Sequence, residues 1–182
     1  MVEYLTRDAI RRSAGPMTET AAVIRKAASR AAAGSSFLSH SSADIDLLPG
    51  AIKILEDHGA QVYIDKKDDR LPPTTNRDTA AALRDRIQQS KKFILLTTIN
   101  SKDSRWVPWE LGLADGYRRV PNIAIFPGVD SVNDRTWAER EYLGVYDRIV
   151  FGSHQNYPRP IYMVWNQATN TGTELAAWLR RQ

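Results

Sequence analysis

The segment Lys92-Phe93-Ile94-Leu95-Leu96-Thr97 is the clearest indication of the fold class, because it contains a continuous apolar run, Phe93 to Leu96, between polar neighbours. Such a run, without polar alternation, is typical of a strand that is buried on both faces of a parallel sheet. Similar short apolar runs lie on both sides of it, at 36–39, 61–64 and 123–126. The sequence therefore predicts several strands of one buried sheet.

Helical patterns separate these runs along the chain. Apolar residues within 44–58 recur at helical spacing, and helices are also predicted over 78–89 and about 105–117. Strands that alternate with helices need crossover connections, which produce an α/β fold with a mostly parallel sheet. In such sheets ligands bind outside the carboxyl ends of the strands.

The first 33 residues differ from the rest of the chain. They are rich in Ala, Arg and Thr, contain no strand-like run and predict one or two helices interrupted at Gly15-Pro16, with partial disorder as the competing interpretation. We therefore predict two parts, an N-terminal helical extension over residues 1–33 and one α/β domain over residues 34–182.

Weaker signals follow the fourth strand. Pro127-Gly128 is predicted to end that strand, and the segments 148–151 and 161–165 are strand-like. A last helix is predicted after them, with Asn170 or Thr171 as its cap.

The composition is that of a soluble, single-domain protein. The 182 residues have 42% hydrophobic and 25% charged side chains, and no apolar run approaches the roughly 18 residues that span a bilayer. No secretory signal is visible, so we expect a cytoplasmic protein without membrane contact. The formal net charge of +4 is mild and interspersed, which argues against a nucleic-acid interface.

Several kinds of site are excluded by residue type and spacing. The absence of Cys excludes disulfides and thiolate sites. His40, His58 and His154 show no metal-ligand spacing, so we predict no metal. No glycine occurs between Ser39 and Pro49, which excludes a dinucleotide fingerprint or a phosphate loop after the first long strand.

Three polar segments follow predicted strands and should meet at one edge of the sheet, at 40–43, 65–75 and 97–110. Because they come from separate parts of the sequence, only the fold brings them together. This edge is the predicted ligand-binding edge.

The helix in the last of these segments contains Glu110, the main candidate for a functional side chain. Pro108 is tolerated only in a first helical turn, so the helix begins just before it, with Asp103 or Ser104 as its cap. Trp106 and Glu110 are four residues apart and share a face, and we expect Glu110 to be partly buried. On these residues alone, a functional carboxylate and a favourable placement near the helix dipole both remain open.

Three segments resemble conserved boxes of TIR (Toll/interleukin-1 receptor) domains in order and spacing. They are Ser36-Phe37-Leu38-Ser39-His40-Ser41-Ser42-Ala43-Asp44, Ser90-Lys91-Lys92-Phe93-Ile94-Leu95-Leu96-Thr97-Thr98 and Ser104-Arg105-Trp106-Val107-Pro108-Trp109-Glu110-Leu111. The resemblance runs from about residue 35 to 126. It implies a flavodoxin-like fold, with a central parallel five-stranded sheet and helices on both faces.

The resemblance also implies an activity. Many bacterial and plant TIR domains cleave NAD, releasing nicotinamide and forming ADP-ribose or a cyclic isomer of it. The family's catalytic glutamate falls on Glu110, and the tryptophan associated with cyclisation in bacterial members falls on Trp106. NAD is then the substrate, and no cofactor is expected.

The resemblance extends to biological context. Stand-alone bacterial members of this kind, such as the sensor subunits of Thoeris systems, act in anti-phage defence, where the nucleotide product signals to an effector. The loop that contributes to assembly in the family maps onto residues 66–75, so self-association through TIR surfaces is expected.

Further candidate substrate-binding residues, besides Trp106, lie at the same predicted edge. They are Phe37, Ser39, His40, Asp65 and Thr97. His40 is either a base or a loop histidine bonded to the backbone. Asp65 either orients a ligand hydroxyl or caps a turn.

A single carboxylate suffices for NAD cleavage, because nicotinamide leaves as a neutral molecule without a general acid. Glu110 would stabilise the oxocarbenium-like ribose, while Trp106 would stack on the substrate, exclude water and favour capture within the same molecule. Two alternatives remain open: a non-enzymatic TIR adaptor that acts through TIR–TIR self-association, and an enzyme similar to nucleoside deoxyribosyltransferases.

Overall fold

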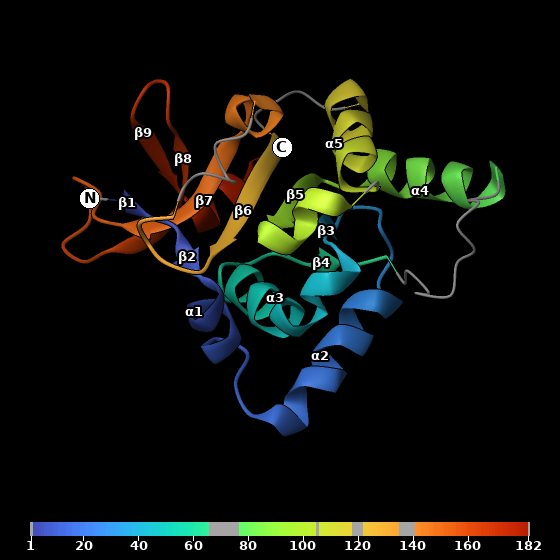
Figure 1. The fold of residues 1–182 in the computed structure, drawn as a ribbon, viewed down its shortest axis with the longest axis horizontal. Helices are drawn as coiled ribbons and strands as arrows, with labels where there is room; N and C mark the ends of the chain where they lie inside the picture. Colours follow the sequence, from blue (N-terminus) through green and yellow to red (C-terminus); the bar gives the residue numbers. More distant parts are fainter. Residues whose placement is uncertain (1, 66–76, 105, 118–121, 135–140, 182) are drawn as a thin grey trace.

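The computed structural model describes residues 2–65, 77–104, 106–117, 122–134 and 141–181. In this part of the chain a mixed sheet separates two layers of helices (Figure 1). The strands are β1 (Val2–Glu3), β2 (Leu5–Thr6), β3 (Ser36–Ser39), β4 (Val62–Tyr63), β5 (Lys92–Thr97), β6 (Ile123–Val129), β7 (Asp147–Gly152), β8 (Ile161–Asn166) and β9 (Thr171–Glu174). The α-helices are α1 (Arg7–Arg12), α2 (Met17–Ser29), α3 (Leu48–Asp57), α4 (Arg77–Gln89), α5 (Trp106–Tyr117) and α6 (Leu175–Arg180), and short 3-10 helices are η1 (Ser42–Leu47), η2 (Ile99–Asp103) and η4 (Glu141–Val145).

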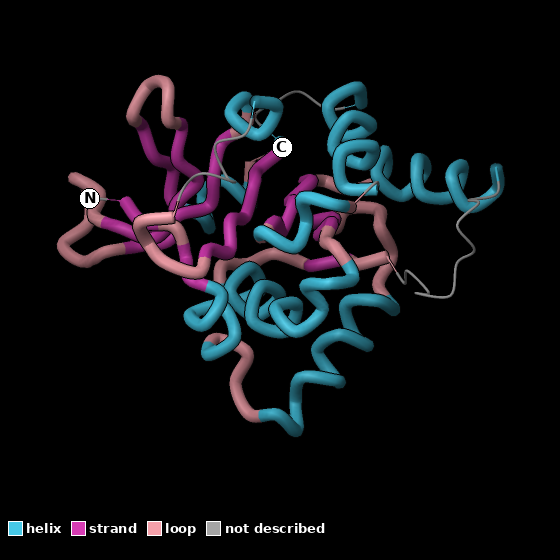
Figure 2. The backbone as a smooth tube through the Cα atoms, viewed as in Figure 1, coloured by secondary structure: helices cyan, strands magenta, loops and turns pink. Residues whose placement is uncertain are grey.

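Five parallel strands form the centre of the sheet, in the order β4-β3-β5-β6-β7. This order confirms the flavodoxin-like fold, and its topological switch point lies between β3 and β5. At the far side β8 and β9 add antiparallel strands. Figure 2 shows the strands gathered between the helical layers.

The two strands beside the switch point match their predicted bounds, 36–39 and 92–97. The predicted end of β6 at Pro127-Gly128 was wrong, because the strand runs on to Val129. The reason is non-local: β2 pairs with the last two residues of β6 and extends it.

The N-terminal segment contains two helices, in agreement with the predicted one or two, and the break at Gly15-Pro16 lies between α1 and α2. The prediction that it contains no strand was wrong, since β1 pairs antiparallel with β7 and β2 pairs parallel with β6. Each of these two strands has only two residues, which is too short to show the alternating pattern by which a strand is recognised in a sequence. Between them the Tyr4 hydroxyl accepts a hydrogen bond of 2.9 Å from the buried Arg148 guanidinium. The division at residue 33 stays a prediction.

Two other helical boundaries differ from prediction. The helix predicted over 44–58 begins as η1 and becomes α3 only at Leu48. The predicted cap of the last helix at Asn170 or Thr171 was wrong, because Asn170 has a positive φ of 53° just before β9 and α6 begins at Leu175.

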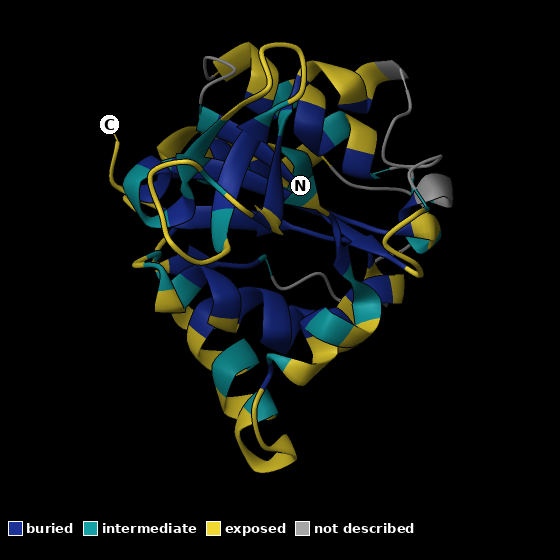
Figure 3. Ribbon diagram, turned by 90° about the vertical axis from the view of Figure 1, so that its left-hand side faces the viewer, coloured by how far each residue is buried: buried dark blue, intermediate teal, exposed yellow. Residues whose placement is uncertain are grey.

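Successive side chains of the central strands point to opposite faces of the sheet and therefore belong to two apolar layers. Ile94 and Leu96 of β5 belong to the layer under α1, α2 and α3, whereas Phe93 and Leu95 belong to the layer under α4 and α5. Figure 3 shows the buried sheet between helices whose outer faces are exposed. Thr97 follows Leu95 by two residues, so alternation places it on the α4–α5 face.

Candidate functional site

Glu110 lies in the early part of α5, where the sequence predicted it. The helix begins at Trp106, so Pro108 lies in its first turn. The Ser104 hydroxyl accepts the Val107 N–H at 3.3 Å, which confirms Ser104 as a capping residue. The Glu110 side chain is completely buried rather than partly buried, because the helix body packs directly on the sheet.

Ser39 and Glu110 meet, although 71 residues separate them in sequence. Ser39 is the last residue of β3, and its buried hydroxyl donates a hydrogen bond of 2.5 Å to Glu110 Oε2. Because β3 borders the switch point, this contact places the carboxylate at the carboxyl end of the central strands. This hydrogen bond also fixes the direction in which the Glu110 carboxyl group points.

Thr97 and Phe37 lie on the same side of the sheet as this pair. Thr97 ends β5 and is 3% exposed. Phe37 is buried in an aromatic cluster, with its ring centroid 5.4 Å from Tyr63 and 5.7 Å from Phe93. Phe37 therefore acts as a packing residue in this structure, and a substrate contact by either side chain stays a prediction.

His40 follows Ser39 at the end of β3 and is buried. Its Nδ1 lies 3.4 Å from the Leu38 carbonyl oxygen, a contact of the backbone-bonded kind that the sequence left open. This contact favours a structural histidine over a base.

Asp65 lies just beyond β4 and is bound by two side chains. It forms an ion pair with Arg86 of α4 and accepts a hydrogen bond of 3.2 Å from the Tyr63 hydroxyl. Burial and the neighbouring Asp65 carboxylate raise the pKa of Tyr63 to about 12. Asp65 therefore ties β4 to α4, and a role in orienting a ligand stays a prediction.

Trp106 is half-buried one turn before Glu110, on the same helix face. Its ring meets Trp109 edge-on, with 5.4 Å between the ring centroids. The Arg84 guanidinium of α4 lies 5.6 Å from the Trp109 ring centroid. Trp109 therefore lies between the Trp106 indole, which is predicted to stack on the substrate, and Arg84 of α4.

Asp44 is a residue that the sequence placed in a motif but not in the site. It is completely buried and accepts hydrogen bonds from Thr98, Asn100 and Ser101, the segment that follows β5. Its only sequence signal was its place in the first box, because its partners lie more than 50 residues away.

Two parts of the predicted edge, residues 66–75 and Arg105, lie outside the described residues. Within the described ranges, His, Asp and Glu form no group of three or more that could hold a metal ion. No helix in that part of the chain is long and apolar enough to cross a membrane.

Comparison with known families agrees with this geometry. Residues 37–148 match the TIR domain family. This chain belongs to the TIR domain family. The match includes most of β3, all of β5 and α5, and the contact between Ser39 and Glu110, whereas α1, α2, β8 and α6 lie outside it.

A relative of this TIR domain protein is the Bacillus cereus (strain MSX-D12) protein named probable 3′ cyclic ADP-D-ribose synthase ThsB′. The two sequences are 35% identical over 119 residues, which cover 64% of this chain and 61% of the relative. The aligned part of this chain thus spans about three fifths of that protein's length.

Proposed function

We propose that this TIR domain protein cleaves the bond between nicotinamide and ribose in NAD, giving nicotinamide and ADP-ribose or a cyclic isomer. The observation that carries the proposal is the buried Glu110 carboxylate, oriented by Ser39 at the switch point of the sheet. The name of the Bacillus cereus relative supports both the substrate and a cyclic product.

The chemistry needs one anion. The carbon–nitrogen bond breaks, and its electron pair passes to the nicotinamide ring, which leaves neutral. Positive charge then develops on the ribose, where a preorganised carboxylate is most stabilising in a site that excludes water. Glu110 takes this role, and the Ser39 hydroxyl holds the carboxylate in place.

The group that attacks the positively charged ribose determines which product forms. Water would add a hydroxyl and release a proton, giving ADP-ribose, whereas a hydroxyl of the same molecule would lose its proton and close a ring. Trp106 is the residue that we assign to this choice, because stacking on an adenine or nicotinamide ring brings the internal hydroxyl close and displaces water. The relative's name makes a ribose 3′ hydroxyl the first internal group to test.

Self-association is part of the proposal. Glu110 is completely buried, so NAD reaches it only when neighbouring groups move. Contact between TIR surfaces of two chains is the event that we propose for this opening. A nucleotide product that binds a downstream effector in anti-phage defence fits the kinship with ThsB′.

The test is incubation of the purified protein with NAD over a wide range of protein concentrations, with and without a crowding agent. Chromatography measures nicotinamide, ADP-ribose and cyclic products. We expect nicotinamide release that rises more than linearly with protein concentration. Glu110→Gln should lower it at least about 100-fold, because it removes the charge that stabilises the transition state.

Glu19→Gln is the matched control, since it makes the same chemical change at an exposed residue of α2. Equal activity of Glu110→Gln and wild type would contradict the proposed mechanism. Absence of nicotinamide release at every concentration would favour the adaptor alternative, in which the TIR domain acts only through self-association.

A further inference from the structure

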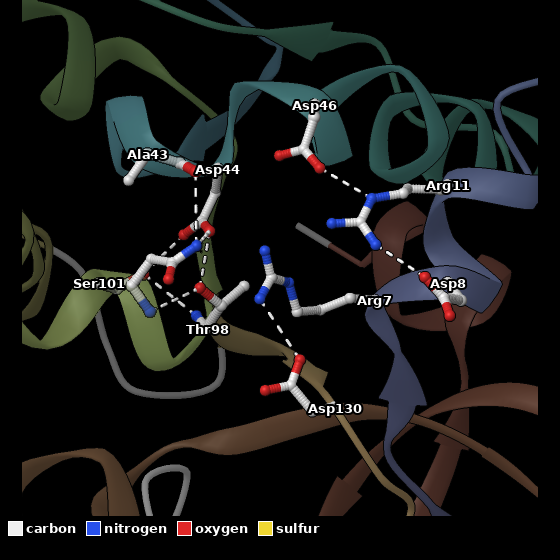
Figure 4. A network of polar contacts seen from close by, with 10 residues as sticks. Arg7, Asp8, Arg11, Ala43, Asp44, Asp46, Thr98, Ser101 and Asp130 are labelled. Atoms are coloured by element: carbon white, nitrogen blue, oxygen red, sulfur yellow. Dashed lines mark hydrogen bonds and ion pairs between the residues drawn. The ribbon is translucent and has the colours of Figure 1, made fainter.

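The Asp44 network consists of Asp44, Thr98, Asn100 and Ser101, and it joins the two 3-10 helices η1 and η2 (Figure 4). Thr98 Oγ1 and Asn100 Nδ2 donate hydrogen bonds to Asp44 Oδ1 at 2.6 and 3.0 Å. The Ser101 hydroxyl donates to Oδ2 at 2.9 Å. Asp44, Thr98 and Ser101 are all buried, so water does not compete strongly for these bonds.

The direction of these bonds requires a carboxylate at residue 44. Each of the two hydroxyls already accepts a backbone N–H: Thr98 Oγ1 accepts from Asn100 at 3.0 Å, and Ser101 Oγ accepts from Thr98 at 3.1 Å. Their protons therefore point toward Asp44, and both of its oxygens must accept. An amide offers one accepting oxygen only, so Asn at this position would leave one buried donor without an acceptor.

The network continues into the helix that carries the candidate catalytic carboxylate. The Ser104 N–H donates to the Ser101 carbonyl at 3.1 Å, and the Ser104 hydroxyl accepts from Val107 N–H. This run of contacts leads from Asp44 to the first turn of α5. At its other end, Asp44 lies five residues after Ser39. The Asp44 network thus connects the two segments that bring Ser39 and Glu110 together.

We propose, on the basis of the proposed NAD cleavage, that Asp44 is a positioning residue for that reaction. Its carboxylate fixes η2 against η1, and η2 sets the start of α5 and hence the places of Trp106 and Glu110. Asp44 does not contact the reacting atoms in this role. Among the described residues it bonds to three neutral donors, which suits a residue that holds a loop in place.

Kinetics of matched variants test the proposal. Asp44→Asn should lower kcat about tenfold or more, with a much smaller change in KM, because a small misplacement of catalytic groups acts on the transition state. Asp46→Asn is the control: it lies on the same 3-10 helix, is half-exposed and pairs with Arg11. It should keep wild-type kinetics.

A second pair of variants separates positioning from general damage to the fold. Thr98→Val removes the hydroxyl but keeps the shape and should reproduce the loss in kcat, whereas Thr98→Ser keeps the hydroxyl and should restore most of it. All assays are made at a temperature where circular dichroism shows each variant folded. An unchanged kcat in folded Asp44→Asn, or equal losses in Thr98→Ser and Thr98→Val, would overturn the proposal.

Hydrogen exchange gives a readout that does not depend on turnover. In Asp44→Asn the amides of residues 98–110 should exchange faster, while those of α2 and β7 keep their wild-type rates. Unchanged exchange over 98–110 would overturn the positioning role even if NAD cleavage is established. Absence of turnover in the wild type would instead overturn the proposed function, and with it any role of Asp44 in the reaction.

Discussion

The two helical layers that cover the sheet differ in how their helices contact each other. On one side α1 meets α3 backbone to backbone, and a Cβ added to Gly50 would overlap the Ile10 carbonyl oxygen. Gly112 and Gly116 lie on the solvent-exposed face of α5, where an added Cβ would meet no other side chain of the described residues within 4 Å. Contacts between α4 and α5 include the Arg84 guanidinium over the Trp109 ring.

The α1–α3 side therefore mainly supports the fold, whereas the α4–α5 side carries the candidate catalytic residue Glu110. The α1–α3 side includes a close backbone contact between Gly50 and Ile10, whereas the contacts near Glu110 include the long side chains of Arg84 and Trp109. A substrate must reach a completely buried carboxylate, and we expect side chains between α4 and α5 to move for it, because a change of rotamer separates no backbone contact. We therefore expect Gly50 on the first side to act mainly on stability, and Ser39 and Trp106 on the second side to act on catalysis.

The largest effect should come from Gly50→Ala. Its methyl group meets backbone atoms rather than a flexible side chain, so α1 and α3 must separate, at a cost of about 3 kcal/mol or more. Gly116→Ala is the matched control and should be neutral or stabilise the fold by up to about 1 kcal/mol. Denaturant unfolding measures both. Equal unfolding midpoints for Gly50→Ala and wild type would refute the close packing of this side.

A smaller effect, measured on catalysis, is expected for Ser39→Ala. The variant removes the donor to Glu110 Oε2, and a hydrogen bond to a charged group is worth about 1.5–3 kcal/mol, so kcat should fall about tenfold or more. Ser29→Ala, at an exposed residue of α2, is the control and should keep wild-type turnover. A Ser39→Ala enzyme with full activity would show that Glu110 is oriented without this hydroxyl.

The sequence predicted those parts of the fold and site that depend on local patterns. The apolar runs located β3 and β5, and Pro108 located the start of α5 and therefore Glu110. Together with the crossover rule, these features placed the main candidates at one edge of the sheet.

What the sequence did not predict depends on distant partners. β1 and β2 are strands only because β7 and β6 accept them, and Asp44 is recognisable as a network centre only once the segment after β5 lies beside it. Asp65 could equally have oriented a ligand or capped a turn until its bonds to Arg86 and Tyr63 were visible. Burial of Glu110 is also a property of the packed layers.

Tyr63 gives a pH-dependent test of the contact between β4 and α4. Its pKa is raised to about 12 by burial and by Asp65, whereas an unfolded tyrosine titrates near pH 10. The stability that this difference contributes is fully present below about pH 10 and is lost as the pH rises toward about 12. Tyr63→Phe should therefore lose less stability than wild type over this range, as measured by urea unfolding at several alkaline pH values. Parallel curves for the two proteins would contradict the buried, hydrogen-bonded phenol.

The smallest effect, on product choice rather than rate, is expected at Trp106. Stacking of an aromatic side chain on a base contributes about 1–3 kcal/mol, so Trp106→Ala should lower the ratio of cyclic to linear product about fivefold or more. Trp106→Phe keeps an aromatic face and should give an intermediate ratio. Trp109→Phe is the neighbouring control, because its ring meets Trp106 only edge-on. If Trp106→Ala keeps the wild-type ratio while nicotinamide release continues, water is excluded by other groups, and the half-buried indole serves only to pack α5.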